Sequence, residues 1–129
     1  MITPGAVFEV PHALADPPQR ARQASPPSRE NRWVLVVSCK ADCTDRYQQT
    51  VIAVLLSAKV EYQGRHDVLI KRPDGGIQRD SIAQTDLALP ILKDELTDER
   101  CRGVVLRDTL RQVRTQLANS LGISGESQA

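Results

Sequence analysis

Two runs of apolar residues dominate the hydrophobic pattern of the chain. Residues 33–38 (WVLVVS) and 50–57 (TVIAVLLS) are apolar or β-branched at almost every position. A strand with one solvent-facing side alternates apolar and polar residues, whereas a continuous apolar run is typical of a strand buried on both faces. The two runs therefore predict the centre of a strongly bent sheet or a small barrel.

Three shorter segments predict further strands. Residues 6–10 (AVFEV) form one, and residues 67–71 (DVLIK) form another. The second precedes Pro-Asp-Gly-Gly at 73–76, a turn sequence in which proline presets φ and glycine permits a positive φ. In residues 86–91 (DLALPI), large apolar residues stand at every second position, Leu87, Leu89 and Ile91. We expect this strand to break at Pro90 and to lie at a sheet edge, because proline lacks a ladder donor.

A single amphipathic helix is predicted near the C-terminus. Its apolar stripe, at spacings of four, three, four and four residues, comprises Leu106, Leu110, Val113, Leu117 and Leu121. This spacing is that of one helix face. Gly122 is a natural residue to end the helix, and we expect residues 124–129 to be a frayed tail. Residues 40–49 are polar and predict a turn-like connection.

A long loop is predicted at residues 11–31. It holds five prolines and three of the arginines considered below, and prolines exclude it from the centre of a sheet. A loop of this length in a compact domain is often functional. A disordered insertion is the alternative. With 129 residues, the chain suits one domain, which we place at residues 1–123.

The net charge of the chain indicates little about its function, but the distribution of charged residues along the sequence is informative. The formal net charge is +1, so no overall basic field indicates a nucleic-acid partner. Residues 18–72 nevertheless hold ten Lys and Arg against five Asp and Glu, whereas residues 73–129 hold seven against nine. A polyanion site is expected in the first part, unless these charges only promote solubility. Aromatic residues make up only 3%, which argues against a base-stacking platform.

The three cysteines predict a reducing compartment. Their number is odd, and their spacing is not that of a disulfide framework. No secretory signal and no long apolar run is found, so we expect a cytoplasmic protein without a membrane segment. Cys39 and Cys43 lack the second pair that a zinc site requires. No phosphate-loop or dinucleotide-binding glycine pattern occurs either. We therefore expect neither a metal nor a cofactor.

The order of these segments resembles that of the MazF/PemK family of plasmid-maintenance and growth-inhibitor toxins. The similar segments cover most of the chain and are residues 4–7 (PGAV), 31–38 (NRWVLVVS), 52–57 (IAVLLS), 80–86 (DSIAQTD) and 103–122. The resemblance implies a mainly β fold with a C-terminal α-helix, an SH3-like small β-barrel that forms a homodimer. It also implies metal-independent cleavage of single-stranded RNA and inhibition by a cognate antitoxin protein.

Three residues are the candidates for catalysis. RNA cleavage by the neighbouring 2′-hydroxyl requires proton transfer and stabilisation of charge on the phosphorus. Arg32 matches the family arginine, and its planar fork suits two phosphate oxygens. Ser57 could donate a hydrogen bond to a phosphate oxygen, and His66 could act as an acid or a base, as imidazole side chains do in catalysis. A surface arginine, a strand-end serine and a surface histidine are the alternatives.

A second set of residues could bind the RNA backbone, and each phosphate contact would make binding salt-dependent. These residues are Arg20, Arg22, Arg29, Lys59, Arg65 and Ser81. Loop solubility is the alternative for the basic ones. Leu56 stands where the family commonly has its catalytic threonine, which leaves Ser57 as the hydroxyl there. This favours a second hypothesis, a non-catalytic module that acts by binding a protein, as gyrase-inhibiting relatives of the fold do.

Overall fold

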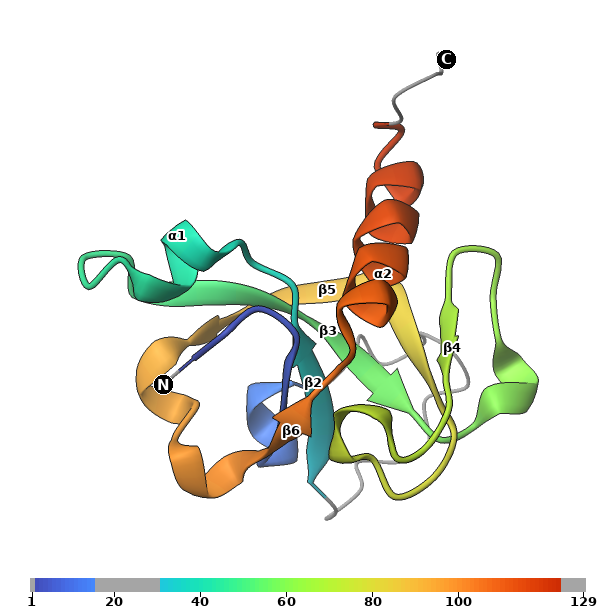
Figure 1. The fold of residues 1–129 in the computed structure, drawn as a ribbon, viewed down its shortest axis with the longest axis horizontal. Coiled ribbons are helices and arrows are strands. Elements are labelled where there is room, and N and C mark those ends of the chain that lie inside the picture. Colours follow the sequence, from blue (N-terminus) through green and yellow to red (C-terminus); the bar gives the residue numbers. More distant parts are fainter. Residues whose placement is uncertain (1, 16–30, 124–129) are drawn as a thin grey trace.

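The computed structural model describes residues 2–15 and 31–123. The predictions for residues 16–30 and 124–129, including those for Arg20, Arg22 and Arg29, lie outside these residues. Six strands form one antiparallel sheet in the order β4-β5-β3-β2-β1-β6, shown in Figure 1. The strands are β1 (Ala6–Val10), β2 (Arg32–Val36), β3 (Thr50–Ser57), β4 (Val68–Ile70), β5 (Ser81–Leu92) and β6 (Cys101–Val104), and the helices are α1 (Lys40–Thr44) and α2 (Arg107–Ser120).

The central strands are buried on both faces, as their apolar runs predict. Val34, Leu35 and Val36 of β2 are all 0% exposed. Because successive side chains point to opposite faces, Val34 and Val36 pack in one core cluster with Phe8, whereas Leu35 packs in another with Val113 of α2. The sheet therefore separates two cores, and α2 covers only one of them.

Strand β5 corrects the prediction made for residues 86–91. It runs unbroken from Ser81 to Leu92 and lies between β4 and β3. Pro90 pairs with Ile52 of β3 and does not end the strand. Only residues 81–83 of β5 pair with β4, so along its second half the other side of β5 has no paired strand among the described residues. Proline is tolerated there because no ladder donor is required on that side.

A turn closes the curled sheet where its two edges approach. The 3-10 turn η3 (Asp74–Gly76) follows β4 at one edge and packs on β6 at the other. A Cβ atom on Gly76 would lie 2.0 Å from the carbonyl oxygen of Arg102, and one on Gly103 would lie 2.8 Å from the backbone of Gly75. Only glycines permit this approach, and Gly76 also has a positive φ of 77°. The predicted turn at 73–76 is thus confirmed and has a further role in closure.

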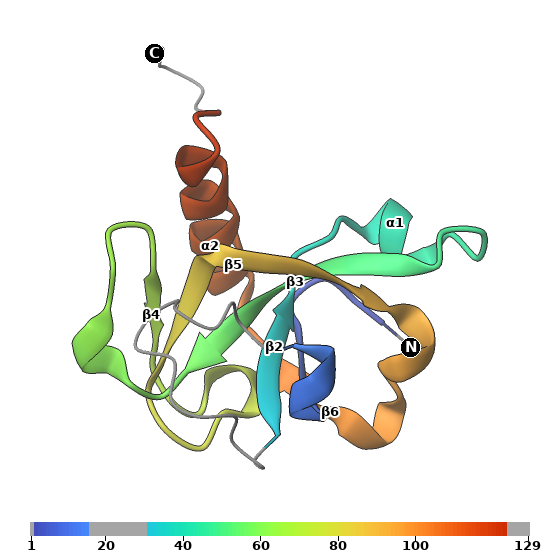
Figure 2. The same ribbon diagram turned by 180° about the vertical axis from the view of Figure 1, so that it is seen from behind.

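The predicted C-terminal helix is confirmed, but only the middle of its apolar stripe is buried. Val113 is 0% exposed, whereas Leu106 and Leu121 are 67% and 66% exposed. Figures 1 and 2 show the reason: α2 rests on the sheet near its first turns and its C-terminal end projects beyond it. The Gly122 N–H donates to Asn119 and the Ile123 N–H to Ala118, the bonding pattern of a Schellman motif.

Two elements were not predicted. Residues 40–44 form the short helix α1 within the segment expected to be turn-like. The Lys93 ammonium donates to the carbonyls of Asp42 and Asp45 and so anchors the end of this helix. Strand β6 pairs with β1 and is only four residues long. No helix in the described part of the chain is long and apolar enough to cross a membrane.

Candidate active site on the β2–β3 face

Arg32 and Ser57 lie opposite one another on neighbouring strands. The pairing of β2 with β3 runs to Trp33 and Leu56, and Arg32 and Ser57 are the next residues on the two strands. Directly opposed residues of an antiparallel pair have side chains on the same face, with Cβ atoms about 4.5–5.5 Å apart. The structure therefore brings together two of the three predicted catalytic residues.

The pair lies on the sheet face that α2 leaves uncovered. Trp33 and Leu56 pack against the core cluster that contains Val113 of α2. Because side chains alternate along a strand, the adjacent Arg32 and Ser57 project from the opposite face. Leu56, which the family comparison placed at the threonine position, is thus a core residue on the α2 side, and the hydroxyl opposite the arginine belongs to Ser57.

Both side chains of the pair are positioned by the ends of their strands. Arg32 is half-buried, with its Nε atom buried, and its backbone pairs with Val10 of β1. Ser57 is half-buried, and its Oγ accepts a hydrogen bond of 3.2 Å from the backbone N–H of Lys59. A hydroxyl that accepts one bond still has its own proton to donate. Ser57 can therefore donate to a phosphate oxygen held by Arg32.

His66 lies on the other side of the sheet. Its Nδ1 is 3.4 Å from Oε1 of Gln116 in α2, and its carbonyl accepts a bond of 3.0 Å from the hydroxyl of Thr85. The structure does not bring His66 to the Arg32–Ser57 pair. Its role as an acid or base stays a prediction.

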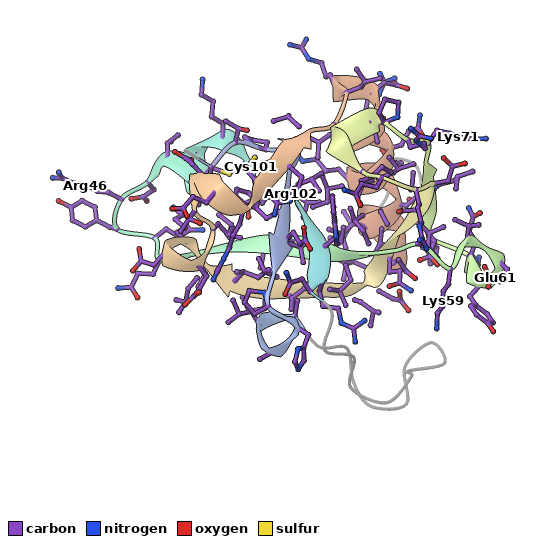
Figure 3. The ribbon with its side chains drawn as sticks, turned by 90° about the horizontal axis from the view of Figure 1, so that it is seen from below. Arg46, Lys59, Glu61, Lys71, Cys101 and Arg102 are labelled. Atoms are coloured by element: carbon purple, nitrogen blue, oxygen red, sulfur yellow. The ribbon has the colours of Figure 1, made fainter. Side chains whose placement is uncertain are left out.

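The described members of the predicted RNA-binding set fall into two places. Lys59 and Arg65 are exposed on the segment between β3 and β4. Figure 3 shows Lys59 beside Glu61, at the end of the molecule away from Arg46. Because Lys59 is two residues from Ser57, a cation stands near the pair.

Ser81 is placed differently from these basic residues. It is buried, and its hydroxyl donates to the carbonyl of Arg79 at 2.9 Å. It pairs with Ile70, which packs in the α2 cluster. Ser81 therefore faces α2, away from Arg32 and Ser57.

Gln84 is a site residue that the sequence reasoning did not select. It pairs with Leu55 on β3, so it lies diagonally from Ser57 and on the same face. Its carboxamide is 6% exposed on a face otherwise built from apolar side chains such as Ile82. A polar residue in the buried first half of β5 was the available signal, but only the pairing register shows which face it occupies.

Within the described residues, no group of three or more His, Cys, Asp or Glu side chains could hold a metal ion. The arrangement instead offers a guanidinium, a hydroxyl and a carboxamide on one face. These are hydrogen-bond donors that suit an anionic, phosphate-containing ligand.

The sequence matches no protein-family model and no curated protein. Solved structures do resemble it. One is a mycobacterial endoribonuclease in complex with its cognate antitoxin, 22% identical over 97% of both chains, with a TM-score of 0.63. Another is MazE–MazF from Deinococcus radiodurans, 16% identical over 96% of this chain and 97% of the other, with a TM-score of 0.61. A third is the Mycobacterium tuberculosis toxin MazF-mt6, 17% identical over 74% of this chain and 90% of the other, with a TM-score of 0.61.

These likenesses extend over nearly the whole chain and concern its fold. They confirm the prediction of a mainly β domain, with a strongly curled antiparallel sheet and a C-terminal helix. The chain therefore has the fold of the MazF toxins.

Proposed function

We propose that this protein is the toxin of a toxin–antitoxin pair, a metal-independent endoribonuclease that cuts single-stranded RNA and inhibits growth. One observation carries the proposal: Arg32 and Ser57, both half-buried, come next after the paired residues Trp33 and Leu56 and lie on the sheet face away from α2, in a fold shared with endoribonuclease toxins. The guanidinium and the hydroxyl are the groups that a transferring phosphate needs.

In the proposed mechanism, the 2′-hydroxyl of the RNA loses its proton to solvent as its oxygen bonds to the adjacent phosphorus. The P–O5′ bond breaks, the leaving 5′-oxygen takes up a proton from solvent, and a 2′,3′-cyclic phosphate remains. Negative charge develops on the non-bridging oxygens as the bond forms. Arg32 binds two of these oxygens in a bidentate manner, and Ser57 donates a hydrogen bond to one of them. Donors fixed in place before reaction stabilise the transition state most, and removing one commonly lowers the rate about 10²–10³-fold.

Lys59 and Arg65 would bind flanking phosphates. Both are exposed and lie on the segment that follows β3, so RNA bound at Ser57 would pass close to them. Phosphate contacts of this kind release counterions, and binding should weaken steeply as salt rises.

The proposed partner is a cognate antitoxin, since one solved relative is an endoribonuclease bound to its cognate antitoxin. We further propose a homodimer and a cytoplasmic location, in keeping with the three free cysteines. The non-catalytic alternative depended on Leu56 at the threonine position. Because the register puts Ser57, and not Leu56, opposite Arg32, that reason for preferring it is removed.

The test uses purified full-length protein, mixed single-stranded RNA, low salt and excess EDTA. We expect wild-type protein to cut the RNA, Arg32→Ala to cut at least about 100-fold more slowly, and Arg46→Ala to match wild type. Arg46 is a suitable control because it is exposed on the α1–β3 connection, at the end of the molecule away from Lys59 in Figure 3. Intact RNA with wild-type protein, or equal cleavage by Arg32→Ala, would refute the proposal.

A further inference from the structure

A cavity of about 420 Å³ lies between the β4 edge and helix α2. Its walls come from the segment before β4, from β4 itself and from one face of the helix. The residues that matter here are Gln63, Val68, Leu69, Gln112, Thr115 and Gln116. The cavity is separate from the Arg32–Ser57 pair and has no role in the mechanism above.

Each of the three glutamines in the wall has one end of its amide held by the protein. Gln63 Nε2 donates to the carbonyl of Asp67 at 3.4 Å, and Gln112 Nε2 donates to the carboxylate of Asp108 at 2.9 Å. Gln116 Oε1 is 3.4 Å from Nδ1 of His66. Among the described residues, the other end of each amide has no hydrogen-bond partner.

The wall therefore presents a mixed set of oriented groups. Oε1 of Gln63 and of Gln112 can accept hydrogen bonds, Nε2 of Gln116 can donate, and the Thr115 hydroxyl can do both. The nearby Arg111 guanidinium is already paired with Asp108. A neutral ligand that carries donors and acceptors side by side suits such a wall better than a simple anion.

A nucleobase has these properties. Its edge presents adjacent donors and acceptors, and side-chain amides recognise such edges with paired hydrogen bonds. The cavity volume is near the lower end of the roughly 300–1,000 Å³ typical of small-ligand sites, which suits one base. Val68, whose side chain faces α2, adds apolar surface for the flat face of the ring.

The cavity lies on the α2 side of the edge strand β4, whereas Ser57 projects from the other face of the sheet, and the segment between β3 and β4 joins the two places. Leu69 pairs with Ile82, and Ile82 pairs with Ser57, so Leu69 is two strands from Ser57. At about 4.8 Å between strands, this separation is about 10 Å. RNA would have to pass around the β4 edge, so its path is longer than this separation and exceeds three stacked nucleotides at roughly 3.4 Å each.

We propose that the cavity between β4 and α2 binds one nucleobase of the RNA substrate and sets base preference several nucleotides from the cut. The assignment of RNA as the source of that base rests on the proposed function. The chemistry of the cavity does not, so the two can be tested separately.

The first experiment measures binding without cleavage. The 5′-monophosphates of adenosine, cytidine, guanosine and uridine are titrated into isotope-labelled full-length protein, and the side-chain amide NMR signals of Gln63 and Gln116 are followed. One or two nucleotides should shift them saturably, at least about fivefold more weakly in Gln112→Leu. Asn119→Leu makes the same change at an exposed site on α2 outside the cavity and should behave as wild type. If no nucleotide shifts these signals at about 10 mM, or if Gln112→Leu responds as wild type does, the proposal is wrong.

The second experiment sequences the cleavage products of a random single-stranded RNA pool. We expect Gln112→Leu and Thr115→Val each to relax the base preference at one position more than about three nucleotides from the cut. Asn119→Leu should keep the wild-type preference. An unchanged preference in both cavity variants overturns the cavity proposal but leaves the nuclease proposal standing. Nucleotide binding without any RNA cleavage would support the cavity proposal and overturn the nuclease proposal.

Discussion

Asp74 and Thr109 are joined by a hydrogen bond of 2.5 Å from the Thr109 hydroxyl to an Asp74 carboxylate oxygen. The other oxygen of Asp74 accepts a bond of 2.8 Å from the backbone N–H of Leu106. Asp74 thus caps α2 from a turn that lies 32 residues earlier in the chain. Leu106, the residue at the helix start, has no side-chain acceptor of its own, and an anion at this end is favoured by the helix dipole.

Replacing Asp74 with alanine should destabilise the protein by about 1–2 kcal/mol, the usual cost of losing a helix cap. Thermal unfolding followed by circular dichroism should show a midpoint lower by several degrees. Asp74→Asn keeps an acceptor oxygen and should lose less. Asp94→Ala, at an exposed aspartate, serves as the control and should leave the midpoint unchanged. Equal midpoints for Asp74→Ala and wild type would show that the cap contributes nothing.

Two glycines with the same positive φ provide a matched comparison for the closure of the sheet. Gly76 and Gly122 both have φ of 77°, but a Cβ on Gly76 meets the Arg102 carbonyl at 2.0 Å, whereas one on Gly122 meets nothing within 4 Å. Gly122→Ala should cost about 1–2 kcal/mol from backbone strain alone. Gly76→Ala should cost clearly more, because the backbone of β6 must also move. Urea unfolding of both variants measures the difference, and similar losses would argue against a tight turn-to-strand contact.

The sequence predicted the elements that bury apolar runs and failed where burial depends on distant parts of the chain. The bounds of β1 and β3 match the prediction because their apolar residues are contiguous. β6 was missed because its four residues, CRGV, have a weak pattern and become a strand only by pairing with β1. The Asp74 cap was missed for the same reason, since it joins two segments that no local signal connects.

The site was only partly predictable for a related physical reason. Arg32 and Ser57 were selected by their chemistry and by the family resemblance, yet their opposition depends on strand register. Register is read from alternation of apolar and polar residues. Residues 50–57 are apolar on both faces, so they carry no such alternation, and the sequence alone could not tell whether residue 56 or 57 faces the arginine.

Cys43 should give the protein a measurable alkaline sensitivity. Burial raises the pKa of the Cys43 thiol above its ordinary value of 9.0, and the attraction of Lys93 opposes this only in part. The folded state then holds the thiol proton more tightly than the unfolded chain. Stability from this difference is complete below pH 9.0 and is lost as the pH rises through the higher folded-state value.

The measurement is the free energy of unfolding as a function of pH in wild type and Cys43→Ala. The variant loses packing at every pH, but its free energy of unfolding should fall less steeply at alkaline pH than that of wild type. The same burial predicts that iodoacetamide modifies the exposed Cys39 before Cys43 in the native protein. If the free energy of unfolding falls equally steeply with alkaline pH in both proteins, and if the two cysteines are modified at equal rates, this account is contradicted.

Moving the hydroxyl between residues 56 and 57 tests which of them serves the site. Ser57→Thr keeps a hydroxyl on the face of Arg32 and should retain most of the RNA cleavage. Ser57→Ala removes the donor, and we expect cleavage to fall by about 10–100-fold, less than for Arg32→Ala because a neutral donor contributes less than a charged one.

Leu56→Thr is the informative counterpart of these variants. Leu56 packs with Trp33 on the α2 side, so a threonine there places a hydroxyl in an apolar cluster. It should lower stability by about 1–3 kcal/mol and should not restore cleavage when combined with Ser57→Ala. Restored cleavage in that double variant would mean that residue 56, and not residue 57, reaches the phosphate, and the register of β2 and β3 would then have to differ in the RNA-bound protein.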